Sequence, residues 1–270
     1  MRTAIVNKAS LAYIDSGQGL PLLLVHGFPL DHTMWGGQIE ALSRQFRVIA
    51  PDLRGFGRSD VTEGKVTMRQ MADDLAALLD ALQITSRVVL CGLSMGGYIA
   101  FEFIRAHAGR LCGLILCDTR ASADTPEAAA ARLQMADRVL REGPAPLVES
   151  MIPRLFSPAT VERHPHVVET IRWVIMRNDR RGIAAAARGM AERADSTELL
   201  PQINCPTLLV VGQDDALSPP EQMNQMARAI RDSQYVEIPD AGHLAPLERP
   251  AEVNAAISHF LQRIVAAGAL

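Results

Sequence analysis

One serine of this chain stands in a setting that favours nucleophilic chemistry. Ser94 is the centre of Gly92-Leu93-Ser94-Met95-Gly96, which matches G-x-S-x-G, with a predicted strand before it at 87–91 and a predicted helix after it at 97–107. The backbone of a serine on such a sharp turn is strained, and glycines two positions away avoid clashes with neighbouring chain. An ordinary glycine-rich turn is the alternative. We predict that Ser94 is a nucleophile with its hydroxyl above a sheet.

A serine hydroxyl is a poor nucleophile at neutral pH, so it needs a base within hydrogen-bond reach and a third group that orients the base. His243 follows Gly242 in a loop after the predicted strand 234–238, where packing gives no reason for a histidine. We predict that His243 is the base. The other histidines considered lie in helical or surface segments and are expected to be structural or solvated: His107, His164, His166 and His259.

The third group is expected to be an aspartate at the end of another strand. Asp215 lies just beyond the predicted strand 207–211, and the carboxyl ends of parallel strands meet on one side of a sheet. We therefore predict that Asp215 is the acid. Its neighbour Asp214, and Asp118 after the predicted strand 113–117, are the alternatives, because a loop aspartate is often only a turn or cap residue.

An oxyanion formed by attack on a carbonyl needs fixed hydrogen-bond donors. The backbone N–H of Met95 is placed for this at the start of the helix after Ser94. The loop His26-Gly27-Phe28-Pro29 follows the predicted strand 22–25, so the N–H of Phe28 is the expected second donor, while His26 is expected to brace the loop.

Short runs rich in Val, Ile and Leu alternate with stretches of helical period, which is typical of an α/β protein with a mostly parallel sheet and helices on both faces. Predicted helices span 67–82, where Thr67 and Gln70 form a capping box, 221–230 and 251–265. The first residues predict a hairpin, 2–6 with 11–15. The predicted strands of the parallel part are 22–25, 47–50, 87–91, 113–117, 207–211 and 234–238.

The alternation breaks between 121 and 194, where Ala, Arg and Met dominate and the pattern predicts helices alone. We expect two parts: a core domain, 1–120 and 195–270, and a helical cap, 121–194, above the carboxyl ends of the strands. Met151 and Trp173 are candidate pocket residues, although packing within the cap is the alternative. Cap arginines could bind a substrate carboxylate or remain solvated: Arg132, Arg154, Arg172 and Arg177.

The composition excludes several classes of partner. A net charge of -3 offers no attraction to nucleic acid or anionic lipid, and the apolar runs are too short to cross a bilayer. The N-terminal residues contain no apolar signal core, which favours a cytoplasmic location. The four cysteines form no zinc-binding spacing, so we expect neither a metal nor an organic cofactor. The sequence leaves the oligomeric state open.

These residues resemble the α/β-hydrolases of the carboxylesterase, 3-oxoadipate enol-lactonase and cofactor-free haloperoxidase type. The resemblance covers nearly all of the chain outside the cap, and in this family the acid is the position that matches Asp215. The motifs that carry it are His26-Gly27-Phe28-Pro29, Pro51 to Ser59, Gly92 to Gly97, Gly212 to Asp215, and Gly242-His243 followed by Glu248-Arg249-Pro250.

The resemblance implies a serine hydrolase that cleaves a small carboxylic ester through an acyl-enzyme, with hydrolysis of an enol-lactone as the alternative. Pro29, placed as in epoxide hydrolases and haloperoxidases, adds a candidate pocket position and a possible perhydrolase side activity, whereas Ser94 in place of an aspartate argues against epoxide opening. A non-catalytic binding module on the same fold is the remote alternative, because a fold does not determine a function.

Overall fold

An eight-stranded sheet forms the centre of the protein in the computed structural model, which describes residues 1–268. Its spatial order is β1-β2-β4-β3-β5-β6-β7-β8. The strands are β1 (Arg2–Val6), β2 (Ala9–Ser16), β3 (Pro21–Val25), β4 (Arg47–Pro51), β5 (Val88–Leu93), β6 (Leu111–Cys117), β7 (Thr207–Gly212) and β8 (Ser233–Ile238).

The sheet is mostly parallel, as the sequence predicts. β1 and β2 form the expected hairpin, and β2 also pairs antiparallel with β4. The pairings among the six strands from β3 to β8 are all parallel. Every residue of β3, β5, β6 and β7 is buried, because helices cover both faces of the sheet. This explains why these strands appear in the sequence as continuous apolar runs.

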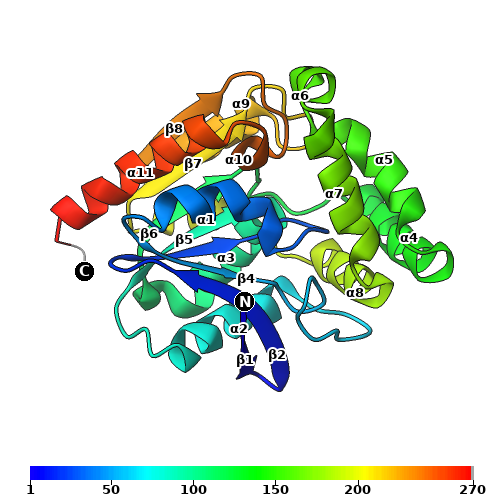
Figure 1. The fold of residues 1–270 in the computed structure, drawn as a ribbon, viewed down its shortest axis with the longest axis horizontal. Coiled ribbons are helices and arrows are strands. Elements are labelled where there is room, and N and C mark those ends of the chain that lie inside the picture. The colour runs from blue at the N-terminus through cyan, green and yellow to red at the C-terminus, as the bar shows by residue number, and fades with distance from the viewer. Residues whose placement is uncertain (269–270) are drawn as a thin grey trace.

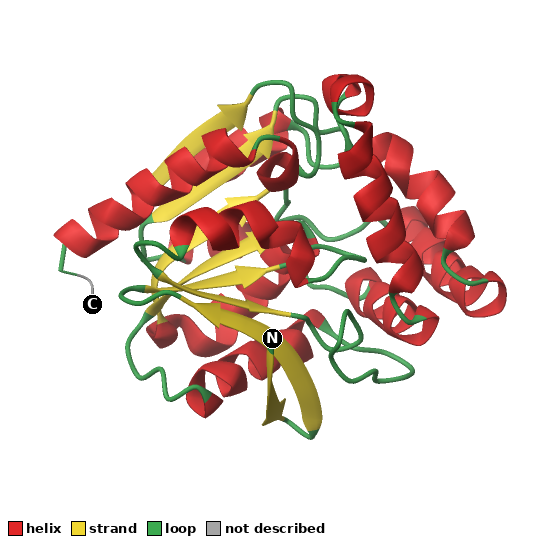
Figure 2. Cartoon of the chain, in the orientation of Figure 1, coloured by secondary structure: helices red, strands yellow, loops and turns green. Residues whose placement is uncertain are grey.

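Helices cover both faces of the sheet (Figure 2). α1 packs against α11 on one face, and α2 packs against α3 on the other. The Thr67 hydroxyl accepts the N–H of Gln70 at 3.1 Å and begins α2 as the capping pattern predicts. The helices of this part are α1 (Gly36–Leu42), α2 (Met68–Ala81), α3 (Met95–His107), α9 (Pro220–Ala229), α10 (Ala245–Glu248) and α11 (Pro250–Ala266), with the 3-10 helices η1 (His32–Trp35), η2 (Ala108–Arg110) and η3 (Thr197–Gln202).

Five helices lie between β6 and η3 and form a separate group at the end of the sheet to which the parallel strands point (Figure 1). Gly182 of α8 lies so close to Gly55 that a Cβ atom on Gly182 would be 1.9 Å from the Gly55 carbonyl oxygen. This contact packs α8 closely against the loop that follows β4. The five are α4 (Pro126–Glu142), α5 (Ala145–Leu155), α6 (Pro158–Arg163), α7 (Pro165–Arg177) and α8 (Arg180–Ala191).

The boundaries of the elements differ from the predictions by one or two residues. β5 continues to Leu93, two residues beyond the predicted end, because Leu93 still pairs with Cys117 of β6. The ladder therefore continues up to the residue before Ser94, and the following turn starts from a fixed backbone. Among residues 1–268, no helix combines the length and the apolar character needed to cross a bilayer.

Candidate active site

Ser94 forms a sharp turn between β5 and α3, which begins at Met95. Its backbone has φ 52° and ψ -110°, a conformation that L-residues rarely adopt, so the turn stores strain. A Cβ atom on Gly92 would lie 2.3 Å from the backbone oxygen of Gly96, and one on Gly96 would lie 2.3 Å from that of Val25. Both positions therefore require glycine, which is the reason the sequence analysis gives for the pentapeptide.

The structure brings His243 and Asp215 to Ser94 from two other loops. The Nε2 atom of His243 lies 2.8 Å from the Ser94 hydroxyl oxygen, and its Nδ1 atom lies 2.9 Å from Oδ2 of Asp215. Both partners of the serine are buried, with 4% of His243 and 3% of Asp215 exposed. The three side chains thus form a continuous hydrogen-bonded chain from carboxylate to imidazole to hydroxyl.

The surroundings of Asp215 keep its carboxylate ionised. Burial alone would raise the pKa of Asp215, but the charge and hydrogen bond of His243 and two backbone donors outweigh burial and lower that pKa. Those donors are the N–H groups of Leu217 and Ser218, at 2.7 and 3.0 Å from Oδ1. One oxygen is thereby held by the loop, and the other remains free to accept the Nδ1–H of His243.

The alternative acids lie elsewhere. Asp214 is exposed, and its backbone N–H donates to the Ala241 carbonyl at 2.8 Å. Asp118 is fully buried, and its Oδ1 accepts the N–H of Gly212 at 2.8 Å. Neither forms a hydrogen bond with His243 within the described residues. Burial, with the charge of Asp215, raises the pKa of Asp118 well above its ordinary value and so favours the neutral form of this carboxyl.

The loop after β3 brings Phe28 to the cavity of the serine. Phe28 lines the same cavity as Ser94, and Met95 is the first residue of α3, so the N–H of Met95 has no acceptor within the helix. His26 is buried; its Nε2 accepts the N–H of Leu53 at 3.0 Å, so Nδ1 carries the proton that is donated to the Gly27 carbonyl. Burial lowers the pKa of His26, which holds this loop as a neutral brace.

Glu248, which the sequence analysis includes only as part of a motif, holds the loop that carries His243. Its Oε1 accepts the N–H of Gly242 at 2.8 Å and that of Leu244 at 3.3 Å, and its Oε2 accepts the N–H of Ser157 at 2.9 Å. The N–H of His243 itself donates to the Leu155 carbonyl at 2.9 Å. Glu248 thus joins the histidine loop to the end of α5. Its distance of five positions from His243 is the only sequence signal for this role.

A cavity of about 550 Å³ lies between Ser94 and the helices α4, α5 and α8. Met151, a candidate pocket residue, is part of its lining. Trp173 does not: the side chain is 59% exposed and stacks on the guanidinium of Arg177 at 4.3 Å, because it faces outward from α7. Pro29, in the loop after β3, is also buried and is not part of the cavity lining. Its carbonyl accepts the Nδ2–H of Asn178 at 2.8 Å.

Three arginines line the cavity, and one of them was missed by the sequence analysis. Arg132 and Arg154 were candidates, whereas Arg120 was not. Arg120 lies two residues beyond Asp118, so the rule that residues after a strand end face the site could have found it. Arg172 pairs with Glu149 and Glu169, and Arg177 pairs with Asp31, which leaves these two outside the cavity.

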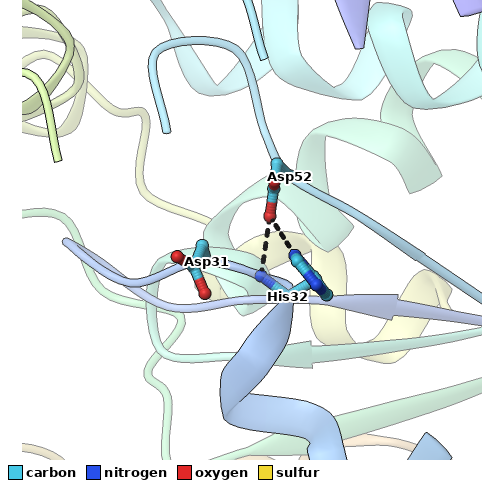
Figure 3. A group of neighbouring side chains, drawn as sticks. All are labelled: Asp31, His32 and Asp52. Atoms are coloured by element: carbon cyan, nitrogen blue, oxygen red, sulfur yellow. Dashed lines mark hydrogen bonds and ion pairs between the residues drawn. The ribbon is translucent and has the colours of Figure 1, made fainter. Parts of the chain in front are cut away.

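Asp31, His32 and Asp52 form a cluster with the spacing of metal ligands (Figure 3). Oδ1 of Asp52 accepts both the backbone N–H and the Nδ1–H of His32, at 2.9 and 2.6 Å, and Oδ2 accepts the N–H of Arg58. Asp31 accepts bonds from Thr33 and Arg177. Burial would raise the pKa of Asp52, but the bonds from His32 and Arg58 lower it. Every carboxylate oxygen is engaged, so the cluster fits a loop brace better than a metal site.

Comparison with known proteins identifies the family of the chain. The family described as alpha/beta hydrolase fold matches residues 21–250. This chain belongs to the α/β-hydrolase fold family. It is 32% identical to 3-oxoadipate enol-lactonase 1 of Acinetobacter baylyi over 87% of this chain and 85% of that one.

Solved structures of other α/β-hydrolases superpose on this one. A thermophilic esterase from Thermogutta terrifontis gives a TM-score of 0.96 at 55% identity, with 97% of this chain and 98% of that chain covered. An enol-lactonase from Burkholderia xenovorans LB400 gives a TM-score of 0.90 at 33% identity, with 97% and 100% covered. The fold class predicted from the sequence, an α/β-hydrolase with a mostly parallel sheet, is confirmed.

Proposed function

We propose that this protein is a serine hydrolase that cleaves small carboxylic esters through an acyl-enzyme, with Ser94 as nucleophile, His243 as base and Asp215 as the acid that orients it. The observation that carries the proposal is the pair of contacts at His243, 2.8 Å to the Ser94 hydroxyl and 2.9 Å to the Asp215 carboxylate. A buried imidazole between a hydroxyl and an ionised carboxylate is arranged to remove the hydroxyl proton.

In the first step, His243 takes the proton of Ser94 while the serine oxygen forms a bond to the substrate carbonyl carbon. Asp215 stabilises the imidazolium that results. The backbone N–H groups of Phe28 and Met95 bind the oxyanion, and each such donor contributes on the order of 3 kcal/mol in the transition state. His243 then protonates the alcohol oxygen as its bond to the carbonyl carbon breaks. A water molecule that His243 deprotonates attacks the acyl carbon, and the bond to the Ser94 oxygen breaks as His243 returns the proton to Ser94 and the acid leaves. The chemistry requires no metal or organic cofactor.

The helices between 121 and 194 serve in this proposal as a cap, and the remaining residues, 1–120 and 195–270, as the core domain. Met135, Met151 and Met190 come from α4, α5 and α8 and line the cavity above Ser94. They give an apolar surface for the acyl or alcohol part of a small substrate. The cavity volume of about 550 Å³ suits a substrate of that size.

Hydrolysis of an enol-lactone is the second candidate function, supported by the resemblance to enol-lactonases that match at least 85% of their own length. An enol-lactone is a cyclic ester, so the same steps would open its ring, with the leaving alcohol retained in the product.

The cytoplasmic location stays a prediction of the sequence.

Substitution of Ser94 tests the proposal directly. We expect Ser94→Ala to reduce hydrolysis of p-nitrophenyl butanoate by about 10⁴-fold or more with the fold retained, because the nucleophile is lost. An organophosphate should add its phosphoryl mass to the peptide that contains Ser94 in the wild type and not in the variant. Ser86→Ala, an exposed serine, is the control. A Ser94→Ala enzyme with most of its activity would refute the assignment.

A further inference from the structure

Positively charged side chains outnumber negatively charged ones in the lining of the cavity. Its lining contains Arg120, Arg132, Arg154 and one acidic residue, Asp124. The Asp124 carboxylate forms ion pairs with two arginines, at 2.6 Å from the Nε atom of Arg132 and at 2.7 Å from the Nη1 atom of Arg193. Asp124 is therefore already paired with other residues and does not neutralise Arg120 or Arg154.

Arg120 keeps its charge without an ionic partner. Within residues 1–268, no carboxylate lies within salt-bridge distance of its guanidinium, and its one side-chain hydrogen bond runs from Nε to the Tyr98 hydroxyl at 3.4 Å. The two terminal nitrogens make no hydrogen bond to the described residues. A half-buried guanidinium with two free donor nitrogens, facing a cavity, is the group that proteins use to bind a carboxylate through two parallel hydrogen bonds.

Contacts of Tyr98 and Thr119 keep Arg120 near Ser94. The Thr119 hydroxyl, one residue before Arg120, donates to the backbone carbonyl of Ser94 at 2.8 Å. Tyr98 lies one helical turn after Ser94 and is itself packed under the guanidinium of Arg193 at 4.2 Å. Arg120 is thereby linked to the serine turn through its neighbour Thr119 and to α3 through Tyr98, and it lines the same cavity as Ser94.

We propose that Arg120 binds a carboxylate carried by the substrate, so that the site prefers small esters or lactones with a second, ionised carboxyl group over uncharged ones. This inference rests on the proposed function. Arg154 is the other arginine of the cavity without an ion pair among the described residues, but its side chain is exposed and can remain in water, whereas Arg120 is half-buried.

Two esters that differ only in charge test the proposal. Monoethyl succinate is ethyl butanoate with the terminal methyl group replaced by a carboxylate, and monoethyl glutarate has the same relation to ethyl pentanoate. For each pair, the ratio of kcat/KM for the charged to the uncharged ester is measured in a pH-stat at low salt. We expect Arg120→Met to lower the ratio about 10- to 100-fold, mainly through KM of the charged ester, because it removes a charge-assisted bidentate contact.

Two further variants separate binding from structure. Arg120→Lys keeps the charge but not the planar fork, so it should lower the ratio less than Arg120→Met does. Arg154→Met removes one charge from the exposed arginine of the cavity and should change the ratio by less than about 3-fold. Equal losses on both esters in Arg120→Met, an unchanged ratio, or a loss carried by Arg154→Met instead would overturn the proposal.

A measurement of glutarate binding tests the carboxylate site without relying on catalysis. Calorimetry with glutarate should show binding to the wild type and at least 10-fold weaker binding to Arg120→Met, or to Arg120→Lys if the methionine variant does not fold. A wild type that cleaves neither ester but binds glutarate through Arg120 would contradict the proposed function and leave the carboxylate site standing. A wild type that cleaves ethyl butanoate and does not bind glutarate would overturn the carboxylate site alone.

Discussion

Asp214 and Asp215 are adjacent in the chain and lie in opposite environments. Asp215 is buried and bound to His243, while Asp214 is exposed. Gln213 and Asp214 form a turn that the Asp215 N–H closes by donating to the Gly212 carbonyl at 3.1 Å, and this turn decides which carboxylate meets the imidazole. The low pKa of Asp215, which the charge of His243 and its backbone donors hold down against burial, keeps the buried member of the pair ionised at neutral pH.

Because the two aspartates are adjacent and differ in burial, the same substitution at each of them tests which one is the acid. Asp215→Asn should lower kcat for p-nitrophenyl butanoate by about 10⁴-fold, because a neutral amide neither stabilises the imidazolium nor selects the tautomer with a proton on Nδ1. Asp214→Asn should change kcat by less than about 3-fold. Steady-state kinetics at pH 7.5 measure both. Comparable losses in the two variants would mean that the acid has been wrongly assigned.

The helices α4 to α8 are attached to both loops that flank the serine. Asn178, directly after α7, donates to the Pro29 carbonyl at 2.8 Å and accepts the N–H of Gly57 at 2.8 Å, which ties the group to the loop of Phe28. At the other side, Glu248 and the Leu155 carbonyl tie the end of α5 to the loop of His243. The same helices that close the cavity therefore also fix the loops on which its chemistry depends.

Glu248 offers a prediction at the scale of these elements. In Glu248→Gln an amide N–H₂ replaces one acceptor oxygen and cannot accept both sets of N–H groups from Gly242, Leu244 and Ser157. The histidine loop should loosen, with kcat falling about 10-fold, KM changing less, and the free energy of unfolding falling by about 1–3 kcal/mol.

The control for this prediction is Glu252→Gln, an exposed glutamate at the start of α11 that should leave all three quantities nearly unchanged. Kinetics together with chemical denaturation separate the two outcomes. A Glu248→Gln protein that loses stability while keeping wild-type kcat would show that Glu248 supports the fold and does not position His243.

At the scale of the whole molecule, Asp118 makes stability depend on pH. Its carboxyl is fully buried, and within residues 1–268 its Oδ2 atom has no hydrogen-bond partner. Burial, reinforced by the charge of Asp215, raises the pKa of Asp118 well above the ordinary value of 3.8. The native state therefore keeps a proton that the unfolded chain releases above about that pH, and the free energy of unfolding falls as pH rises, by about 1.4 kcal/mol per unit while the group is protonated only in the native state.

Asp118→Asn should remove this dependence, because the amide is neutral at every pH and its oxygen can still accept the N–H of Gly212. We expect the free energy of unfolding of the variant, relative to the wild type, to increase as pH rises above the ordinary carboxyl pKa, in denaturant titrations carried out from pH 4 to pH 7. Asp214→Asn, which changes the same group at an exposed position, is the control. A relative stability of Asp118→Asn that does not change over this range would contradict the buried neutral carboxyl.

The sequence by itself determined the features that depend on neighbours along the chain. Apolar runs predicted the strands, proline marked the starts of α9 and α11, and Gly92 with Gly96 marked the serine turn, where any larger side chain would collide with the backbone. Residues that follow the strand ends could be placed on one side of the sheet, because parallel strands all end there.

Tertiary structure alone decided which side chains face the cavity and which charges find partners. From the sequence, Trp173 and Met151 are equally good candidates for the pocket because both lie in the helical segment 121–194, but in the structure Trp173 is exposed and stacks on Arg177. Arg132, Arg177 and Arg120 are alike in the sequence, yet the first two meet aspartates from distant segments and Arg120 meets none among the described residues. Such differences arise from contacts between residues far apart in the chain, and a local pattern contains no information about them.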